Sequence, residues 1–67
     1  MTMTLKAARV NINLTQVQAA ELLGISKDTL YNYENGRSYP NVQIIKKIEE
    51  VYGLSYNDIN FLPIYND

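Results

Sequence analysis

The sequence predicts an all-α fold, because apolar residues recur at spacings of three and four and the signals that begin and end helices alternate along the chain. Residues that commonly cap the start of a helix stand before each such segment, at Thr4, Thr15, Ser26, Asn41 and Ser55. We therefore expect a compact fold of five short helices, in a single domain that spans residues 1–67.

The first helix is expected over residues 5–12, with Thr4 as its cap. Asn13 should end it, because asparagine tolerates the left-handed backbone conformation better than other residues that carry a side chain. An apolar stripe at helical spacing is formed by Leu5, Ala8 and Ile12. The stripe predicts that one side of this helix is buried.

Residues 16–35 predict a helix-turn-helix, in which two short helices are joined by a tight turn. Thr15 and Gln18 can form a capping box that begins the first of these helices. Gly24 should end it, because glycine adopts the left-handed conformation without steric cost. Ser26 then caps the second helix, so the two helices meet at a fixed corner.

The two helices of this motif combine an apolar side with a polar one. The residues expected to pack inward are Val17, Ala19, Ala20, Leu23, Leu30 and Tyr33. The second helix also carries a polar stripe with no evident core partner, formed by Lys27, Asp28, Tyr31, Asn32 and Asn35. Such a stripe contacts either solvent or a ligand.

The C-terminal part of the chain predicts two more helices. Asn41 caps a helix over residues 42–52, which Gly53 ends, and another capping box begins a short helix over residues 56–60. The core stripe of the longer helix is expected to be Val42, Ile45, Ile48 and Tyr52. We expect the apolar C-terminal segment 56–65 to form a dimer contact, and the alternative is that it folds back over its own chain.

The composition excludes several classes of protein. Because the chain has no cysteine and no histidine, it lacks the residues for disulfides, zinc–thiolate sites, histidine metal sites and the usual hydrolase triads. We therefore expect no enzyme activity, no cofactor and no metal. The apolar runs are too short for a transmembrane segment or a signal peptide, and the absence of cysteine fits a cytoplasmic setting.

A net charge of −1 argues against strong non-specific attraction to nucleic acid. The charge is unevenly distributed, because residues 1–40 carry four basic and three acidic side chains whereas residues 41–67 carry two basic and four acidic ones. The excess acid therefore lies away from the polar stripe. Binding to nucleic acid would then depend more on dimerisation and on direct contacts to bases.

The same residues carry a resemblance to a known family. Its features are Thr15, Gln16, Ala20, Gly24, Ile25, Ser26, Leu30, Tyr33, the run 34–37, Pro40 and the run 53–55. Over residues 5–59 the chain resembles the helix-turn-helix regulators of the Cro and cI type, which are called the XRE family. The resemblance implies a five-helix fold like that of lambda repressor.

The resemblance further implies a transcriptional regulator, in the first place a repressor from a phage or mobile element, that binds a palindromic operator in double-stranded DNA as a homodimer. The helix that begins at Lys27 would lie in the major groove. A second hypothesis is an antitoxin or adaptor whose main partner is a protein. A third is a small structural module without a nucleic-acid partner.

Five residues of the second motif helix are candidates for reading bases, namely Lys27, Asp28, Thr29, Tyr31 and Asn32. Asparagine pairs bidentately with adenine, and lysine donates to guanine or to a phosphate. Plainer interpretations remain, since Lys27 and Asn32 could form only a solvated face and Asp28 could serve only the helix dipole.

Contacts to the DNA backbone are assigned to Gln16, Asn35 and Arg37. Gln16 stands at the start of a helix, where unpaired amides and a positive partial charge attract phosphate. Asn35 could instead only end its helix. The resemblance also implies a structural ion pair between Arg9 and Glu34, and the alternative is a phosphate contact by Arg9.

Overall fold

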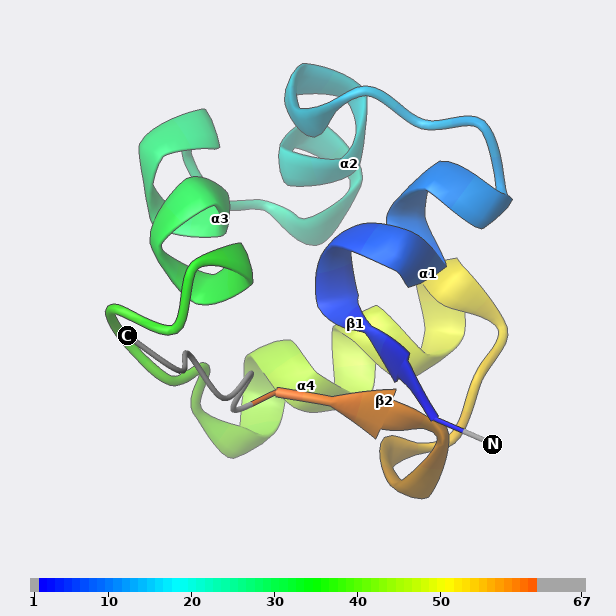
Figure 1. Cartoon of the computed structure of the whole chain (residues 1–67). Coiled ribbons are helices and arrows are strands. Elements are labelled where there is room, and N and C mark those ends of the chain that lie inside the picture. The colour runs from blue at the N-terminus through cyan, green and yellow to red at the C-terminus, as the bar shows by residue number, and fades with distance from the viewer. Residues whose placement is uncertain (1, 62–67) are drawn as a thin grey trace, which may run out of the picture.

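The computed structural model describes residues 2–61, within which four α-helices pack around one core (Figure 1). In chain order the elements are β1 (Met3–Thr4), α1 (Leu5–Asn11), α2 (Gln16–Leu23), α3 (Lys27–Glu34), α4 (Val42–Tyr52), the 3₁₀ helix η1 (Tyr56–Asp58) and β2 (Ile59–Asn60). The all-α class predicted from the sequence is confirmed. No helix among residues 2–61 is long and apolar enough to cross a membrane. The single domain over residues 1–67 stays a prediction, because it extends beyond the described range.

The α-helices begin and end where the local signals predict. Each begins with a side-chain oxygen that accepts a hydrogen bond from the backbone N–H three residues on, and the four caps are Thr4, Thr15, Ser26 and Asn41. Just past the ends of α1, α2 and α4, the φ angles of Asn13, Gly24 and Gly53 are 61°, 72° and 68°. This left-handed conformation explains why glycine or asparagine stands at these positions.

The short fifth helix expected over residues 56–60 is formed only as the 3₁₀ helix η1 (Tyr56–Asp58), so its predicted extent is wrong. The N–H of Ser55 donates to Asp58 Oδ2 at 3.2 Å, as in a capping box, and the Ser55 hydroxyl donates to the same oxygen at 3.0 Å, but these bonds begin only the single turn η1. The next two residues form β2, which pairs in parallel with β1 and places Met3 opposite Ile59. Pairing with β1 replaces helical hydrogen bonds here, and Ile59 reaches the core with 5% exposure.

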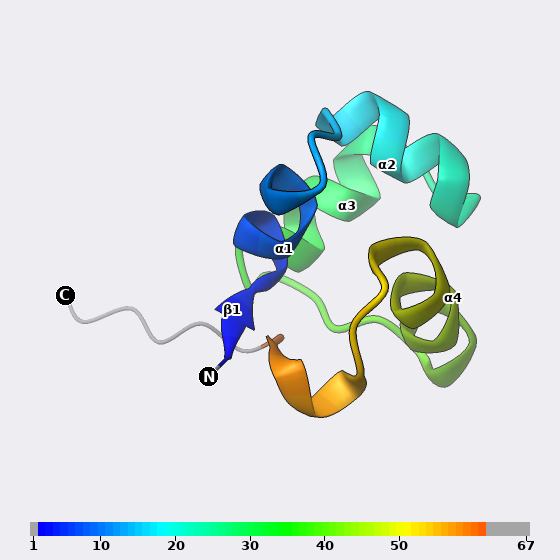
Figure 2. The same ribbon diagram turned by 90° about the vertical axis from the view of Figure 1, so that its right-hand side faces the viewer.

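The strand pair and the helix-turn-helix lie at opposite ends of the molecule. Figure 2 shows α2 and α3 side by side at the top and β1 at the lower left, with α1 between them. Residues 3–4 and 59–60 are thereby joined although they are far apart in the sequence. The strand pair closes the fold on the side away from α2 and α3.

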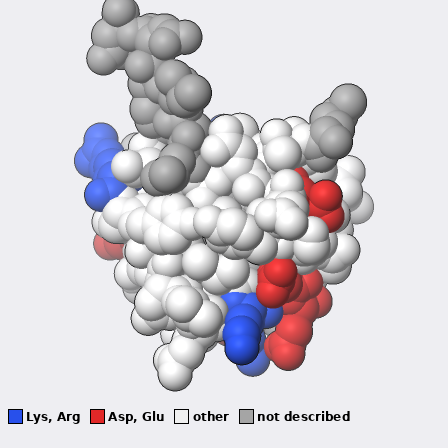
Figure 3. Space-filling model, turned by 90° about the horizontal axis from the view of Figure 1, so that it is seen from below, with Lys and Arg blue, Asp and Glu red and all other residues white. Residues whose placement is uncertain are grey.

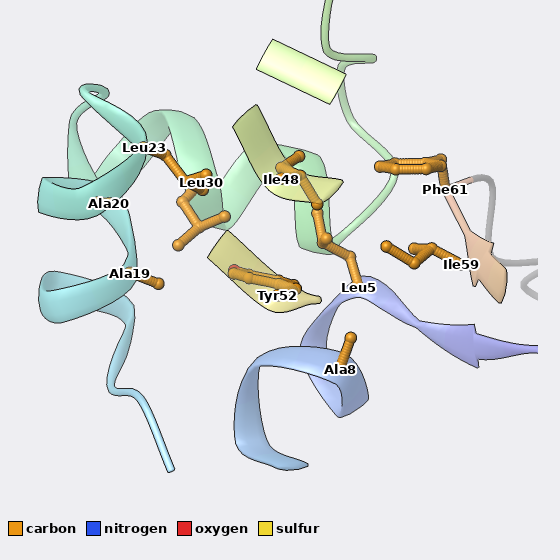
Figure 4. Close-up of a cluster of buried hydrophobic side chains, with 10 residues drawn as sticks. All are labelled: Leu5, Ala8, Ala19, Ala20, Leu23, Leu30, Ile48, Tyr52, Ile59 and Phe61. Carbon is orange, nitrogen blue, oxygen red and sulfur yellow. The ribbon is translucent and has the colours of Figure 1, made fainter. Parts of the chain in front are cut away.

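The core is formed by side chains from all four α-helices and from the segment after η1. Leu5, Leu30 and Ile48 come from α1, α3 and α4, are the largest fully buried side chains, and point toward one another (Figure 4). Ile59 and Phe61 close the core beside β2. Burial of a side chain of this kind stabilises the fold by about 1.5–3 kcal/mol relative to leaving it exposed.

Two valines that were expected in the core are exposed, Val17 by 55% and Val42 by 67%. The inward stripe of α2 begins at Gln16, which is half-buried, so Val17 lies one position off the stripe. The inward stripe of α4 contains Ile44 in place of Val42. Both errors misplace the first turn of a helix and leave the rest of its buried side correct.

Three aromatic side chains form a cluster where the chain leaves β2. The Phe61 ring stacks on the Tyr56 ring, with centroids 5.3 Å apart, and lies 5.9 Å from the Tyr39 ring. The hydroxyls of Tyr39 and Tyr56 are hydrogen-bonded to each other. The start of the segment predicted to form a dimer contact, up to Phe61, therefore packs against its own chain. Residues 62–65 of that segment lie outside the described residues.

Candidate nucleic-acid interface

Four of the five predicted base-reading residues share one face of α3, because their spacings place them within half a turn of one another. This polar face consists of Lys27, Asp28, Tyr31 and Asn32. Lys27, Asp28 and Tyr31 are exposed and Asn32 is half-buried. Within residues 2–61 the side chains of Lys27, Asp28 and Asn32 make no hydrogen bond or ion pair. Their polar groups are therefore available to a ligand.

Thr29, the fifth predicted base reader, lies off this face and takes part in the cap of α3. Its backbone N–H donates to Ser26 Oγ at 3.1 Å, and the Ser26 hydroxyl donates to Thr29 Oγ1 at 2.8 Å. The side chain of Thr29 is half-buried. Its hydroxyl oxygen is therefore already engaged within the chain, and its methyl group is not.

At its C-terminal end α3 carries Glu34, whose carboxylate forms a buried ion pair with Arg9. Arg9 Nε donates to Glu34 Oε2 at 2.7 Å and Arg9 Nη2 donates to Glu34 Oε1 at 3.2 Å, so the pair is bidentate. The two side chains are 8% and 2% exposed, and Arg9 Nη1 also donates to the Leu14 carbonyl at 2.8 Å. The structure thus contains the ion pair that the resemblance implied. Buried and bonded in this way, Arg9 is not placed for the alternative phosphate contact.

Gln16, which was assigned to the DNA backbone, also takes part in this network. Its Nε2 donates to Glu34 Oε1 at 3.0 Å, so Glu34 binds side chains from α1 and α2 at once. An amide nitrogen of this kind carries two hydrogens, and this bond uses one. The side chain of Gln16 is therefore fixed at the first position of α2 with one donor left.

The hydroxyl of Tyr52, on α4, is buried near the same network. Burial in the core, and after it the Glu34 carboxylate, raise the pKa of Tyr52 to about 12, whereas the Arg9 guanidinium acts in the opposite direction. No hydrogen-bond partner for this hydroxyl is found within the described part of the chain. Tyr52 is in the core as predicted, but it carries an unpaired polar atom there.

The end of α3 is closed by a Schellman motif, which fixes the loop that follows it. The N–H of Arg37 donates to the Asn32 carbonyl at 2.9 Å, and the N–H of Gly36 donates to the Tyr33 carbonyl at 3.3 Å. Gly36 has a φ angle of 70°, which the motif requires. The backbone of Arg37 therefore follows α3 as a rigid continuation.

The other two residues assigned to the DNA backbone, Asn35 and Arg37, lie at this end of α3. Asn35 Nδ2 donates to the Tyr31 carbonyl at 2.8 Å, so Asn35 does help to end the helix, with one amide hydrogen unused. Arg37 is exposed, and its guanidinium carbon lies 5.9 Å from the centre of the Tyr31 ring. The helix-ending role of Asn35 and a phosphate contact are thus physically compatible.

The sequence predicted the polar residues around Glu34, and the resemblance implied its pair with Arg9. The bond from Gln16 to Glu34 was not predicted. That bond depends on how α2 is rotated against α3, which local patterns do not specify. One available signal was the position of Gln16, which stands three and four residues before Ala19 and Ala20 on the buried stripe. The nearness of Tyr52 to the ion pair has no such signal, because it depends on the packing of α4.

Other kinds of site are not found within residues 2–61. The structure shows no pocket for a small ligand there and no group of acidic residues that could hold a metal ion. The unbonded groups of the polar face remain the candidate site.

Comparison with known proteins assigns the family. A family model described as helix-turn-helix matches residues 5–59. The chain therefore belongs to the helix-turn-helix family of the XRE type, and the resemblance seen in the sequence is confirmed. No solved structure matches the chain.

Three relatives illustrate the family. Antitoxin PezA of Streptococcus pneumoniae is 38% identical over 55 residues, which are 82% of this chain and 35% of PezA. The HTH-type transcriptional activator BcrR of Enterococcus faecalis is 33% identical over 55 residues, 82% of this chain and 27% of BcrR. The uncharacterized HTH-type transcriptional regulator MJ0272 of Methanocaldococcus jannaschii is 36% identical over 55 residues, 82% of this chain and 83% of that protein. The chain thus spans about a third of the length of PezA and about a quarter of the length of BcrR.

Proposed function

We propose that this chain is a sequence-specific transcriptional regulator that binds double-stranded DNA with α3 in the major groove. The observation that carries the proposal is the polar face of α3 in a chain of the helix-turn-helix family: three of its four residues are exposed, Asn32 is half-buried, and none makes a side-chain hydrogen bond within residues 2–61. The second helix of such a motif enters the major groove with its N-terminal residues against base edges. The names of BcrR and MJ0272, which describe transcriptional regulators, support this proposal.

The polar face carries three kinds of group that base edges can recognise. The Asn32 amide can pair bidentately with adenine, the Lys27 ammonium can donate to guanine or to a phosphate, and the Asp28 carboxylate can accept from the amino group of cytosine. Thr29, whose hydroxyl oxygen is engaged at the cap, would contribute its methyl group to a thymine. Asn32 is the strongest candidate, because a short amide in the middle of α3 has fewer alternatives than a flexible lysine.

Gln16, Asn35 and Arg37 are proposed to bind the phosphate backbone and so to set the position of α3 on the duplex. Gln16 and Asn35 each retain one amide hydrogen after their bonds within the chain. Arg37 is exposed and charged, and its backbone is fixed by the Schellman motif. These donors lie at the start of α2 and at the end of α3.

A homodimer on a palindromic operator is the proposed form on DNA. A single domain with a net charge of −1 gains little from non-specific attraction, so a second copy would supply the affinity that charge does not. Seen from the side of α4 and β2, the visible surface is mostly uncharged, with one group of acidic and basic side chains below and to the right of its centre (Figure 3). The exposed side chains of this face are the proposed dimer contact, whereas Ile59 and Phe61 of the segment 56–65 are already buried in their own chain. Promoter occlusion by the dimer would give repression.

Selection from a random duplex library with the purified chain tests the proposal directly. Enrichment of a palindrome with half-sites about 10 base pairs apart, or a multiple of that, is the expected result. Enrichment of a sequence without symmetry would keep DNA binding and remove the dimer. Failure to enrich any duplex at low salt would contradict DNA binding itself.

One observation favours a second candidate function, an antitoxin. PezA, which is named as an antitoxin, is 38% identical over the shared 55 residues. Those residues are 35% of PezA, so the likeness covers a minor part of that protein. Co-purification of the chain with one stoichiometric protein from its native cells would support this function, and binding of that protein should then change the affinity for DNA.

A further inference from the structure

Tyr31 stands apart from the rest of the polar face, because it contacts a residue that is itself assigned to DNA. The Arg37 guanidinium lies over the Tyr31 ring at 5.9 Å from the ring centre, within the range of a cation–π contact. Tyr31 is 44% exposed, so the contact lies at the surface and not in the core. Among the polar-face residues Lys27, Asp28, Tyr31 and Asn32, only Tyr31 has a side-chain partner within residues 2–61.

The backbone around this contact is unusually well fixed for the end of a short helix. Asn35 donates twice to the Tyr31 carbonyl, from its backbone N–H at 3.0 Å and from Nδ2 at 2.8 Å. The N–H of Arg37 donates to the Asn32 carbonyl at 2.9 Å. Both ends of the Tyr31–Arg37 contact are therefore fixed at the backbone, and the cation–π contact limits the remaining freedom of the long arginine side chain.

We propose that Tyr31 is a positioning residue for Arg37, and that its ring holds the guanidinium in place to bind one phosphate of the DNA backbone. A guanidinium is planar, and its five N–H groups point outward in that plane. A cation–π contact with the ring uses none of these donors, so it can orient Arg37 and leave its N–H groups for a phosphate. This inference rests on the proposed DNA binding and changes the role of Tyr31 from reading bases to placing a backbone contact.

The two roles of Tyr31 differ in what they do to sequence preference. A side chain that reads a base changes the preference at one base pair, whereas a contact to phosphate contributes equally to all sequences and adds to the salt dependence. A Tyr31 that acts through Arg37 should therefore have no effect of its own once Arg37 is removed. A Tyr31 that touches a base should keep its effect.

The test compares the unsubstituted chain with Tyr31→Phe, Tyr31→Leu, Arg37→Ala and the double variant Tyr31→Leu/Arg37→Ala. Dissociation constants are measured on the selected duplex, on its single-base variants and over a range of salt concentrations. Tyr31→Phe, the matched control, keeps the ring and should bind within about twofold of the parent. Tyr31→Leu should weaken binding by about two- to fivefold on every duplex, as expected for an exposed cation–π contact.

The double variant decides the matter. Tyr31→Leu should cost nothing further in the Arg37→Ala background, and both single changes should lower the salt slope. Additive losses, or a changed preference at one base pair in the Arg37→Ala background, would overturn the positioning role of Tyr31 while DNA binding stands. Absence of binding by the unsubstituted chain to any duplex would instead overturn the proposed function, and this inference with it. Thermal melting of each variant verifies that the fold is kept.

Discussion

The polar side chains on the two sides of α3 differ in whether they are hydrogen-bonded within the chain. On the stripe that contains Leu30 and Glu34, the helix is buried, and both oxygens of Glu34 accept hydrogen bonds from α1 or α2. On the polar face the side chains of Lys27, Asp28 and Asn32 make no hydrogen bond within residues 2–61. The eight residues of α3 thus include a buried carboxylate whose two oxygens both accept hydrogen bonds and a polar face whose side chains make none within residues 2–61.

The difference separates the residues that make the fold from the residues that are free to bind. A buried carboxylate persists only when it is paired, because an isolated buried charge is very costly. An exposed amide or ammonium carries no such requirement, since water satisfies it until a ligand replaces the water. Burial together with bonding therefore assigns Glu34 to the fold, whereas the unbonded side chains of the polar face are the ones proposed to bind DNA.

The largest expected effect is a loss of stability when the buried ion pair of Glu34 with Arg9 is broken. Glu34→Ala removes the partner of Arg9 and leaves a buried guanidinium unpaired, which costs about 3–5 kcal/mol. A domain of this size rarely has more than about 3–5 kcal/mol in total. We therefore expect Glu34→Ala to be largely unfolded at 25 °C, as circular dichroism and urea titration would show.

Glu21→Ala is the matched control for Glu34→Ala, because Glu21 is an exposed acid on the neighbouring helix α2 and its side chain makes no bond within residues 2–61. Its unfolding free energy should stay within about 0.5 kcal/mol of the parent. Replacing both partners, as in Arg9→Met with Glu34→Leu, should restore much of the stability. If the unfolding free energy of Glu34→Ala lies within about 1 kcal/mol of the parent value, the Arg9–Glu34 pair contributes no more than an exposed pair.

The next effect belongs to the polar face and concerns specificity. Asn32→Ala should relax discrimination at one base pair in each half-site by about 1–3 kcal/mol and leave the salt slope nearly unchanged. The fold should survive, because the Asn32 side chain makes no bond within the described residues and its carbonyl still accepts from Arg37. Unchanged preference at every position of the duplex would remove Asn32 from the set of base-reading residues.

A smaller effect is expected where the polar face meets the end of the helix. Arg37→Ala should weaken binding similarly on all duplexes and lower the slope of log K against log salt by about one unit, because the variant binds one phosphate fewer. Measurements at several salt concentrations, with Lys6→Ala as a control cation outside the helix-turn-helix, would show whether the effect is specific to Arg37. A salt slope that does not change would contradict a phosphate contact.

The sequence predicts well what depends on residues close together in the chain. The caps of α1 to α4, the glycines after α2 and α4, and the span of the helix-turn-helix each follow from residues within a few positions of one another. The β1–β2 pair could not be predicted, because two-residue strands have no periodicity and their pairing joins residue 3 to residue 59. The exposure of Val17 could not be predicted either, since the rotation of α2 depends on α3 and α4.

The candidate site follows the same rule. The residues of the polar face could be named from their spacing on one helix and from the resemblance. Their environment could not, because the bond from Gln16 to Glu34 joins α2 to α3 and the buried position of Tyr52 depends on α4. Whether each assigned residue contacts DNA stays a prediction.

The smallest expected effect concerns Tyr52 on α4, whose hydroxyl lies in the core near Glu34. It tests whether every buried polar group in this part of the core has a hydrogen-bond partner. The Tyr52 hydroxyl is buried beside Glu34 but has no hydrogen-bond partner within residues 2–61. Tyr52→Phe removes a buried unpaired polar atom and keeps the ring, so at pH 7 the variant should equal the parent or be more stable by up to about 1 kcal/mol. Urea titration at pH 7 measures this, and a clear decrease in stability would mean that the hydroxyl has a partner after all.

The pH dependence of the unfolding free energy gives a second comparison between the parent and Tyr52→Phe. Because burial and Glu34 raise the pKa of Tyr52 from an ordinary value of 10.0 to about 12, the folded state favours the neutral phenol. Stability from this preference is fully present below pH 10 and is lost as the pH rises toward 12. The parent and Tyr52→Phe differ in this one phenol, so the difference between their unfolding free energies isolates Tyr52. That difference should be constant up to about pH 9 and should then change in favour of the variant. A difference that stays constant to about pH 11 would show that the pKa of Tyr52 is the same in the folded and unfolded chains.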